Sequence, residues 1–272
     1  MRVLSYILDG RSKENQVENS FTKELINYVS VFLTLYFIGS TIELSLNCKK
    51  IWCCNRLKSK NVFHQLWGKL MATNREFLYR RIHSLLGVIP VGVFLIQHLV
   101  VNHFATKGPE AFNKAASFME HLPFRYILEI FVIFLPIIYH AFYGIYIAIT
   151  AKNNTKNYGY FLNWMFYLQR LTGVITLIFI IWHIWETRVA AAMGQEVNYE
   201  MMQENLANPF MFAFYVVGVI STIFHFSNGL WSFCVSWGIT VSPKSQRIST
   251  YVTIGVFIAL SIVGVRALLA FI

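Results

Sequence analysis

Charged side chains are scarce in this chain of 272 residues and make up 13% of the sequence, against about 25% in an average soluble domain. Hydrophobic residues account for 56% and aromatic residues for 17%. The charges lie between long apolar runs rather than inside them, whereas a soluble helical bundle needs polar outer faces along its helices. The pattern excludes a cytosolic enzyme and predicts an integral membrane protein.

The sequence also lacks the motifs of soluble cofactor chemistry. It contains no GxGxxG or GxxxxGK[ST] loop, so flavin, nicotinamide or ATP chemistry would require a partner chain. Its four cysteines form no CxxC pair and have none of the spacings of zinc or iron–sulfur sites. The net charge of +10 comes from Lys and Arg beside apolar runs, which is typical of loops facing lipid headgroups, so no nucleic-acid partner is expected. A redox metal would have to use histidine ligands.

The first 70 residues differ from the rest of the chain. They contain one weak apolar segment, residues 26–46, and then a basic stretch with three of the cysteines. The apolar segment has the length of a span or a signal sequence, but it includes Glu43 and is not followed by a small-residue cleavage site. Because Met71 begins a stretch that resembles a natural protein start, we interpret residues 1–70 as an N-terminal extension upstream of the native start. An added span is the alternative.

Beyond Met71, five apolar stretches each approach the ~20 residues of a spanning helix. They are too long, and too poor in alternating polarity, to be barrel strands. The expected fold is therefore all-α, an integral membrane bundle of five transmembrane helices over residues 71–272. The excess of Lys and Arg on one set of connections predicts that Met71 is cytoplasmic and that the C-terminus lies outside. The stretches are residues 85–104, 127–150, 166–188, 210–236 and 249–272.

Four of the eight histidines lie within these stretches. A helical rise of about 1.5 Å per residue puts His98 and His183 in the outer third of the bilayer and His140 and His225 in the inner third. The two members of each pair are 85 residues apart in sequence. Two facing imidazoles suit the axial positions of a haem iron, whereas zinc would need four protein ligands. We therefore predict two haems stacked across the membrane.

An interhelical hydrogen bond is the alternative role for any single intramembrane histidine. The matched depths of four histidines favour ligation over that alternative. Of the remaining histidines, His83 is expected at the inner membrane edge, as an interfacial or propionate-facing side chain. None of the four, His83, His64, His103 or His121, is expected to have a partner at a matching depth.

Long strings beyond Met71 resemble the cytochrome b subunit of succinate dehydrogenase, of the dihaem, single-anchor type found in Gram-positive bacteria. The resemblance covers about residues 71–272 and implies that the family's four axial histidines match His98, His140, His183 and His225. The strings that carry it are NREFLYRRIHSLLGVIPVGVFLIQHLVVNHF, LPFRYILEIFVIFLPIIYHAFYGIYIAITAKNN, LQRLTGVITLIFIIWHIWETR and STIFHFSNGLWSFCVSWGITVSPKSQRISTYV.

The resemblance implies a function as a membrane anchor in the bacterial cell membrane. The chain would pass electrons from an iron–sulfur subunit through two haem b groups to menaquinone. Succinate oxidation would take place on a flavoprotein subunit, so FAD and the iron–sulfur clusters belong to partner chains. A dihaem anchor of a fumarate reductase, hydrogenase or formate dehydrogenase is the alternative. A transporter or purely structural anchor, whose histidines only form hydrogen bonds, is a third class.

Two carboxylates near the outer ends of spans are candidates for carrying protons to a quinone. Glu129 lies in the second stretch, and Glu186 lies three residues after His183; an ionisable group at such a depth is costly enough to suggest a role. The structural alternatives are an ion pair of Glu129 with Arg125 on the same helical face, and, for Glu186, contact with headgroups or a bond from Arg188.

Overall fold

The computed structural model describes residues 75–272. The expectations for residues 1–70 and for Met71 as a start lie outside the described residues. So do those for the first three cysteines and for His64.

Within the described residues every regular element is a helix and no strand occurs. Five helices are long and apolar enough to cross a membrane, which confirms the expected all-α fold with five spans. The helices of the first and third spans extend several residues beyond their apolar stretches, whereas the helix of the second span begins only two residues earlier, at Arg125. The five helices are Arg75–Lys107, Arg125–Thr150, Phe161–Ala192, Pro209–Ser236 and Pro243–Leu269.

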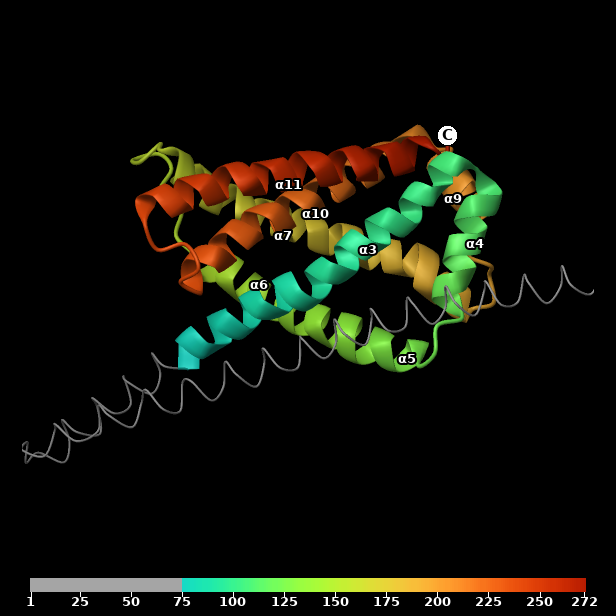
Figure 1. Cartoon of the computed structure of the whole chain (residues 1–272), viewed down its shortest axis with the longest axis horizontal. Helices are drawn as coiled ribbons and strands as arrows, with labels where there is room; N and C mark the ends of the chain where they lie inside the picture. Colours follow the sequence, from blue (N-terminus) through green and yellow to red (C-terminus); the bar gives the residue numbers. More distant parts are fainter. Residues whose placement is uncertain (1–74) are drawn as a thin grey trace, which may run out of the picture. The chain divides into compact units, whose positions relative to one another are not determined.

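The fourth span occupies the centre of the bundle. This helix, α10 (Pro209–Ser236), packs against α7 (Phe161–Ile184) on one side and α11 (Pro243–Leu269) on the other. The first span contributes α3 (Gly92–His103), which packs on α11, and the second contributes α6 (Leu135–Thr150), which contacts α7 (Figure 1). Residues from α3, α6 and α7 can therefore approach those of α10.

Helices α10 and α11 begin with the same local signals. The side chain of Asn208 accepts a hydrogen bond from the backbone N–H of Phe210, and Ser242 forms a capping box with Ser245. Each cap is followed by a proline at the first helical position, Pro209 in α10 and Pro243 in α11. A side-chain oxygen satisfies a free N–H at the helix start, and proline needs no partner there, so these sequences define where both spans begin.

One end of the bundle is covered by short helices. Helix α4 (Pro109–Glu120), helix α9 (Tyr199–Leu206) and the C-terminus lie there together (Figure 1). The side chain of Asn113 in α4 accepts a hydrogen bond from the backbone N–H of Tyr199 at 2.8 Å. The main buried cluster of the described residues lies at this end and comprises Ala105, Phe112, Phe179, Met202, Leu206, Tyr215, Leu268 and Phe271.

The opposite end carries the start of the first span and two connections, residues 151–160 between α6 and α7 and residues 237–242 between α10 and α11 (Figure 1). Of the 13 Lys and Arg in the described residues, five lie in the start of the first span and in residues 151–160, and Lys244 and Arg247 lie in the first two turns of α11. We call this end the basic end and the one that carries α4 and α9 the capped end.

Three of the spans contain a π-helical turn, at Gly87–Val91, Glu129–Phe134 and Trp185–Val189. Pro90 lies inside the first, and Pro136 follows the second; a proline has no N–H for the regular helical hydrogen bond, which explains the altered pattern. The second turn contains Glu129, and the third contains Glu186. Single π-helical turns are frequent at functional sites, so both carboxylates lie in the kind of turn where a functional role is common.

Candidate metal centres

Four histidines from four helices form two facing pairs. At the capped end His98 of α3 faces His183 of α7, with ring centroids 5.7 Å apart and ring planes at 75°. Toward the basic end His140 of α6 faces His225 of α10, with centroids 5.9 Å apart and planes at 86°. The structure thus brings together the same histidines that the depth argument paired.

The spacing within each pair suits one metal ion between two imidazoles. Bonds of about 2 Å from a metal to each ring nitrogen put facing ring centroids roughly 6 Å apart. Among the described residues no group of three or more His, Cys, Asp or Glu side chains could hold a metal ion. Each pair therefore offers two nitrogen ligands and nothing else, which suits the two axial positions of haem iron and not a four-ligand zinc site.

In the pair toward the basic end, His140 and His225, which we call the inner pair, both histidines are oriented by backbone carbonyls. His140 Nδ1 lies 2.9 Å from the carbonyl oxygen of His83, and His225 Nδ1 lies 3.0 Å from that of Gln169. A carbonyl oxygen only accepts, so Nδ1 of each ring must carry the proton. Nε2 then presents its lone pair to the space between the rings, as a metal ligand requires.

In the pair at the capped end, His98 and His183, which we call the outer pair, His183 is oriented by side chains instead. Its Nδ1 lies 3.4 Å from the hydroxyl of Tyr215, and this hydroxyl donates to Glu186 at 2.7 Å. His98 has a different neighbour, because the Asn102 side-chain nitrogen lies 3.3 Å from His98 Nε2 and donates to the His98 carbonyl oxygen at 2.8 Å. The two outer histidines therefore have unlike surroundings.

Two glycines leave room for the inner histidine rings. A Cβ at Gly87 would overlap Cε1 of His140, and a Cβ at Gly173 would lie 2.9 Å from Cε1 of His225. Gly87 precedes His98 in the first span, and Gly173 precedes His183 in the third. Each of these two spans therefore carries one histidine of the outer pair and, about three turns earlier, a glycine that makes room for a histidine of the inner pair. Both positions require the absence of a side chain for a close approach.

A second set of polar contacts joins α7 to α10 beside the inner pair. The Gln169 side-chain nitrogen donates to the His225 carbonyl oxygen at 3.0 Å. The Asn228 side-chain nitrogen donates in turn to the Gln169 side-chain oxygen at 2.7 Å and to the Met165 carbonyl at 3.1 Å. These bonds hold the backbone around His225 against α7.

His83 lies closer to the inner pair than the sequence suggested. Its ring stacks on that of His140, with centroids 4.0 Å apart and planes at 9°. Its Nδ1 is buried without a hydrogen-bond partner, as is Nε of Arg81. The guanidinium of Arg81 lies over the Phe77 and Trp237 rings, at 4.6 and 4.9 Å from their centroids. The expectation that His83 has no partner at its depth is therefore wrong, because the stack with His140 was not visible in the helical depth count.

The two candidate carboxylates have different partners. Glu129 forms ion pairs with Arg188 at 2.8 Å and with Arg125 at 3.6 Å. Arg188 therefore pairs with Glu129, across two spans, and not with Glu186 as one alternative had it. The carboxylate of Glu186 accepts a hydrogen bond from the Tyr215 hydroxyl.

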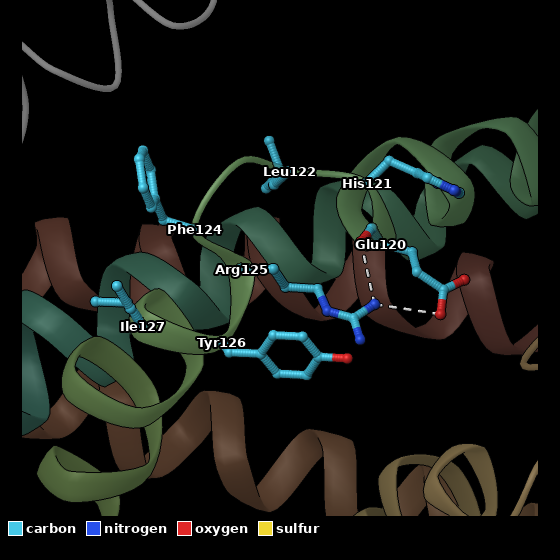
Figure 2. Close-up of a pocket in the computed structure, with 7 residues that line it drawn as sticks. All are labelled: Glu120, His121, Leu122, Phe124, Arg125, Tyr126 and Ile127. Carbon is cyan, nitrogen blue, oxygen red and sulfur yellow. Dashed lines mark hydrogen bonds and ion pairs between the residues drawn. The ribbon is translucent and has the colours of Figure 1, made fainter.

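A cavity of about 650 Å³ opens beside this ion-pair group at the capped end. Figure 2 shows Arg125 reaching toward Glu120, whose carbonyl and carboxylate oxygens accept hydrogen bonds from the guanidinium at 3.0 and 3.2 Å. The cavity is lined by Glu120, His121, Leu122, Phe124, Arg125, Tyr126 and Ile127.

Several residues around the two histidine pairs were not predicted from the sequence. Polar residues such as Tyr215, Gln169 and Asn228 were not singled out, because interhelical contacts leave no periodic signal. Gly87 and Gly173 had a weak signal, since they lie 11 and 10 residues before His98 and His183.

Comparison with known proteins gives two matches. Residues 158–264 match the family model described as succinate dehydrogenase/fumarate reductase transmembrane subunit. A protein of Bacillus subtilis (strain 168), named succinate dehydrogenase cytochrome b558 subunit, is 69% identical over 202 residues. That alignment covers 74% of this chain and 100% of the relative.

Proposed function

The chain belongs to the family of succinate dehydrogenase and fumarate reductase transmembrane subunits, and from this premise we propose that it is the dihaem cytochrome b anchor of a succinate:menaquinone oxidoreductase. It would carry electrons from an iron–sulfur subunit through two haem b groups to menaquinone. The observation that carries this proposal is the presence of two facing histidine pairs at two levels of one bundle.

The residues present fit two haem groups. His98 and His183 would hold the outer iron, and His140 and His225 the inner one. A haem iron with two axial imidazoles supplies a one-electron carrier that has no open coordination position. The hydrogen bonds at Nδ1 of His140, His225 and His183 keep these three rings in the tautomer that can bind iron. The glycines at positions 87 and 173 keep the inner rings free of overlap.

The basic end is the proposed docking face for the soluble partners, an iron–sulfur subunit and a flavoprotein subunit. Basic loops remain on the cytoplasmic side of bacterial membranes, which puts the basic end inside and the capped end with the C-terminus outside. The described basic residues at this end are Arg75, Arg80, Arg81, Lys152, Lys156, Arg170, Lys244 and Arg247.

Menaquinone reduction is proposed near the outer pair, with Glu129 or Glu186 helping to carry protons. The contacts favour Glu186, because both carboxylate oxygens of Glu129 are engaged by arginines. Glu186 is linked by hydrogen bonds to Tyr215, which lies next to His183. A carboxylate that is not neutralised by an arginine is better suited to accept and release a proton.

The proposal is tested by purifying the chain from its membrane with an affinity tag on its own C-terminus. We expect a b-type α-band in the reduced-minus-oxidised spectrum and two haem b per chain. A flavoprotein that oxidises succinate should co-purify. A flavoprotein active on another donor, or a hydrogenase or formate dehydrogenase chain, would favour the alternative anchors. A spectrum without an α-band would overturn both readings in favour of a structural anchor.

A further inference from the structure

The outer histidine His183 takes part in a hydrogen-bonded chain that ends in a carboxylate. The Tyr215 hydroxyl has one proton, which it donates to Glu186 Oε2 at 2.7 Å. Its oxygen is left to accept, so the partner at 3.4 Å, Nδ1 of His183, is the donor. The order of donors is thus His183 to Tyr215 to Glu186.

This arrangement distinguishes His183 from the other candidate ligands in the described residues. His140 and His225 donate to neutral backbone carbonyls. His98 has an amide nitrogen of Asn102 as its neighbour. Hydrogen bonds to a charged acceptor are roughly twice as strong as neutral ones, and bonds in a chain polarise one another. The charge-assisted bond here is the one from Tyr215 to Glu186, so His183 is linked to a carboxylate through the Tyr215 hydroxyl, whereas each inner histidine meets a neutral carbonyl.

Tyr215 is held rigidly in the place that this chain needs. It is 1% exposed and packs edge-on against Phe179, with ring centroids 5.3 Å apart. Phe179 itself stacks on His183, with centroids 5.7 Å apart and planes at 20°. The backbone of His183 is anchored separately, because the Thr187 hydroxyl donates to its carbonyl oxygen at 2.6 Å.

Packing alone does not explain the hydroxyl. A buried hydroxyl costs free energy unless it is hydrogen-bonded, and a phenylalanine would fill the same volume between Phe179 and His183. Glu186 is equally expensive at this depth of the membrane. Among the described residues, the Tyr215 hydroxyl bonds to Glu186 and His183, and the Glu186 carboxylate bonds to Tyr215, which points to a role directed at the histidine.

We propose that Tyr215 is a positioning residue for the outer haem, which fixes the ring of His183 and links it to the carboxylate of Glu186. The proposal rests on the proposed function, since it presumes an iron between His98 and His183. A histidine ligand whose second nitrogen donates to a stronger acceptor gives more electron density to its metal. The oxidised form of the outer haem is then stabilised, and its midpoint potential is lowered relative to the same haem without the chain.

The test is a redox titration of the complete membrane complex that carries Tyr215→Phe. The midpoint potential of the outer haem is expected to rise, while that of the inner haem stays at the wild-type value. The ferric EPR signal of the outer haem should also move, because it depends on the angle between the two axial rings. Tyr199→Phe is the matched control, since it removes a hydroxyl bonded to the Ala270 carbonyl at the same end, away from any candidate ligand.

A second variant tests the same proposal if the Tyr215→Phe complex does not retain the outer haem. Glu186→Gln retains the size of the side chain but removes the charged acceptor, and it should raise the same midpoint potential. The effects of the two substitutions should be less than additive in the double variant, because both act through one chain. Unchanged potential and EPR signal of the outer haem in Glu186→Gln would overturn the proposal. A wild-type complex with fewer than two haems would instead overturn the proposed function.

Discussion

Gln169 and His225 are joined by two hydrogen bonds that run in opposite directions between α7 and α10. His225 Nδ1 donates to the Gln169 carbonyl oxygen, and the Gln169 side-chain nitrogen donates to the His225 carbonyl oxygen, each at 3.0 Å. The first bond orients the ring of the histidine and the second holds its backbone. An inner ligand is thereby fixed to the neighbouring helix at two points.

This relationship predicts that Gln169→Leu loosens the inner centre without removing a ligand. The variant removes the hydrogen bonds that the Gln169 side chain makes to the His225 carbonyl and to the Asn228 amide, and Asn228 keeps its bond to the Met165 carbonyl. Each lost bond costs about 0.5–1.5 kcal/mol. We expect a lower thermal stability and faster loss of the inner haem, measured by following the α-band during heating. Asn163→Leu is the control, because its side chain bonds only to the Tyr158 carbonyl before the span. Equal stability of both variants would contradict the prediction.

The pairing of the histidines predicts which spectral component each substitution removes. His98→Ala and His183→Ala should both abolish the outer haem, and His140→Ala and His225→Ala should both abolish the inner one, since each iron loses one of two axial bonds. Low-temperature optical spectra of the purified complex separate the two components. His121→Gln is expected to keep both haems, because His121 bonds only within its own turn. Loss of the same component in His98→Ala and His140→Ala would refute the pairing.

The close approach at Gly87 predicts a large effect of one methyl group. In Gly87→Ala the new Cβ overlaps the His140 ring, so the ring must shift and the inner haem should be lost or weakly bound. Gly255→Ala is the matched control, because a Cβ there meets nothing within 4 Å, and a helical glycine replaced by alanine gains about 0.5–1 kcal/mol. The measurement is haem content per chain after purification. Full haem content in Gly87→Ala would show that the ring has room to move.

The contacts of the two carboxylates predict unequal effects on quinone reduction. Glu186→Gln should lower succinate oxidation with a menaquinone analogue by about tenfold or more, in the range of lost proton-transfer groups. Glu129→Gln should act mainly on stability, because it breaks ion pairs with Arg125 and Arg188. Succinate oxidation with an artificial acceptor that takes electrons from the soluble subunits is the reference for both. If quinone activity is at the wild-type level in both variants with the haems intact, neither carboxylate carries protons.

The orientation predicts where the soluble partners touch the chain. Lysine-specific crosslinks to the iron–sulfur subunit should form at Lys152 and Lys156, in the exposed connection between α6 and α7, and at Lys244, which is exposed in the first turn of α11. Lys107 and Lys114 at the capped end are internal controls and should give none. Digestion and mass spectrometry of crosslinked membranes make the comparison. Crosslinks confined to Lys114 would reverse the proposed orientation.

The fold could be foreseen from the order of residues because its main signals are local. A run of about 20 apolar residues specifies a spanning helix whatever it packs against, and all five helices are present. The depth of a histidine follows from its distance to the end of its own helix. The resemblance in long strings is confirmed by a relative that is 69% identical.

The contacts around the histidines were beyond such reasoning, because they depend on the rotation and register of each helix against its neighbours. Hydropathy specifies neither quantity. The sequence therefore offered Arg188 as a partner of Glu186, whereas the packing of α7 on α10 brings Tyr215 to Glu186, and Arg188 pairs with Glu129 of the second span. In the same way, the stack of His83 on His140 requires the first and second spans to meet at one level. Local composition determines which segments span the bilayer, and interhelical packing determines which side chain each histidine meets.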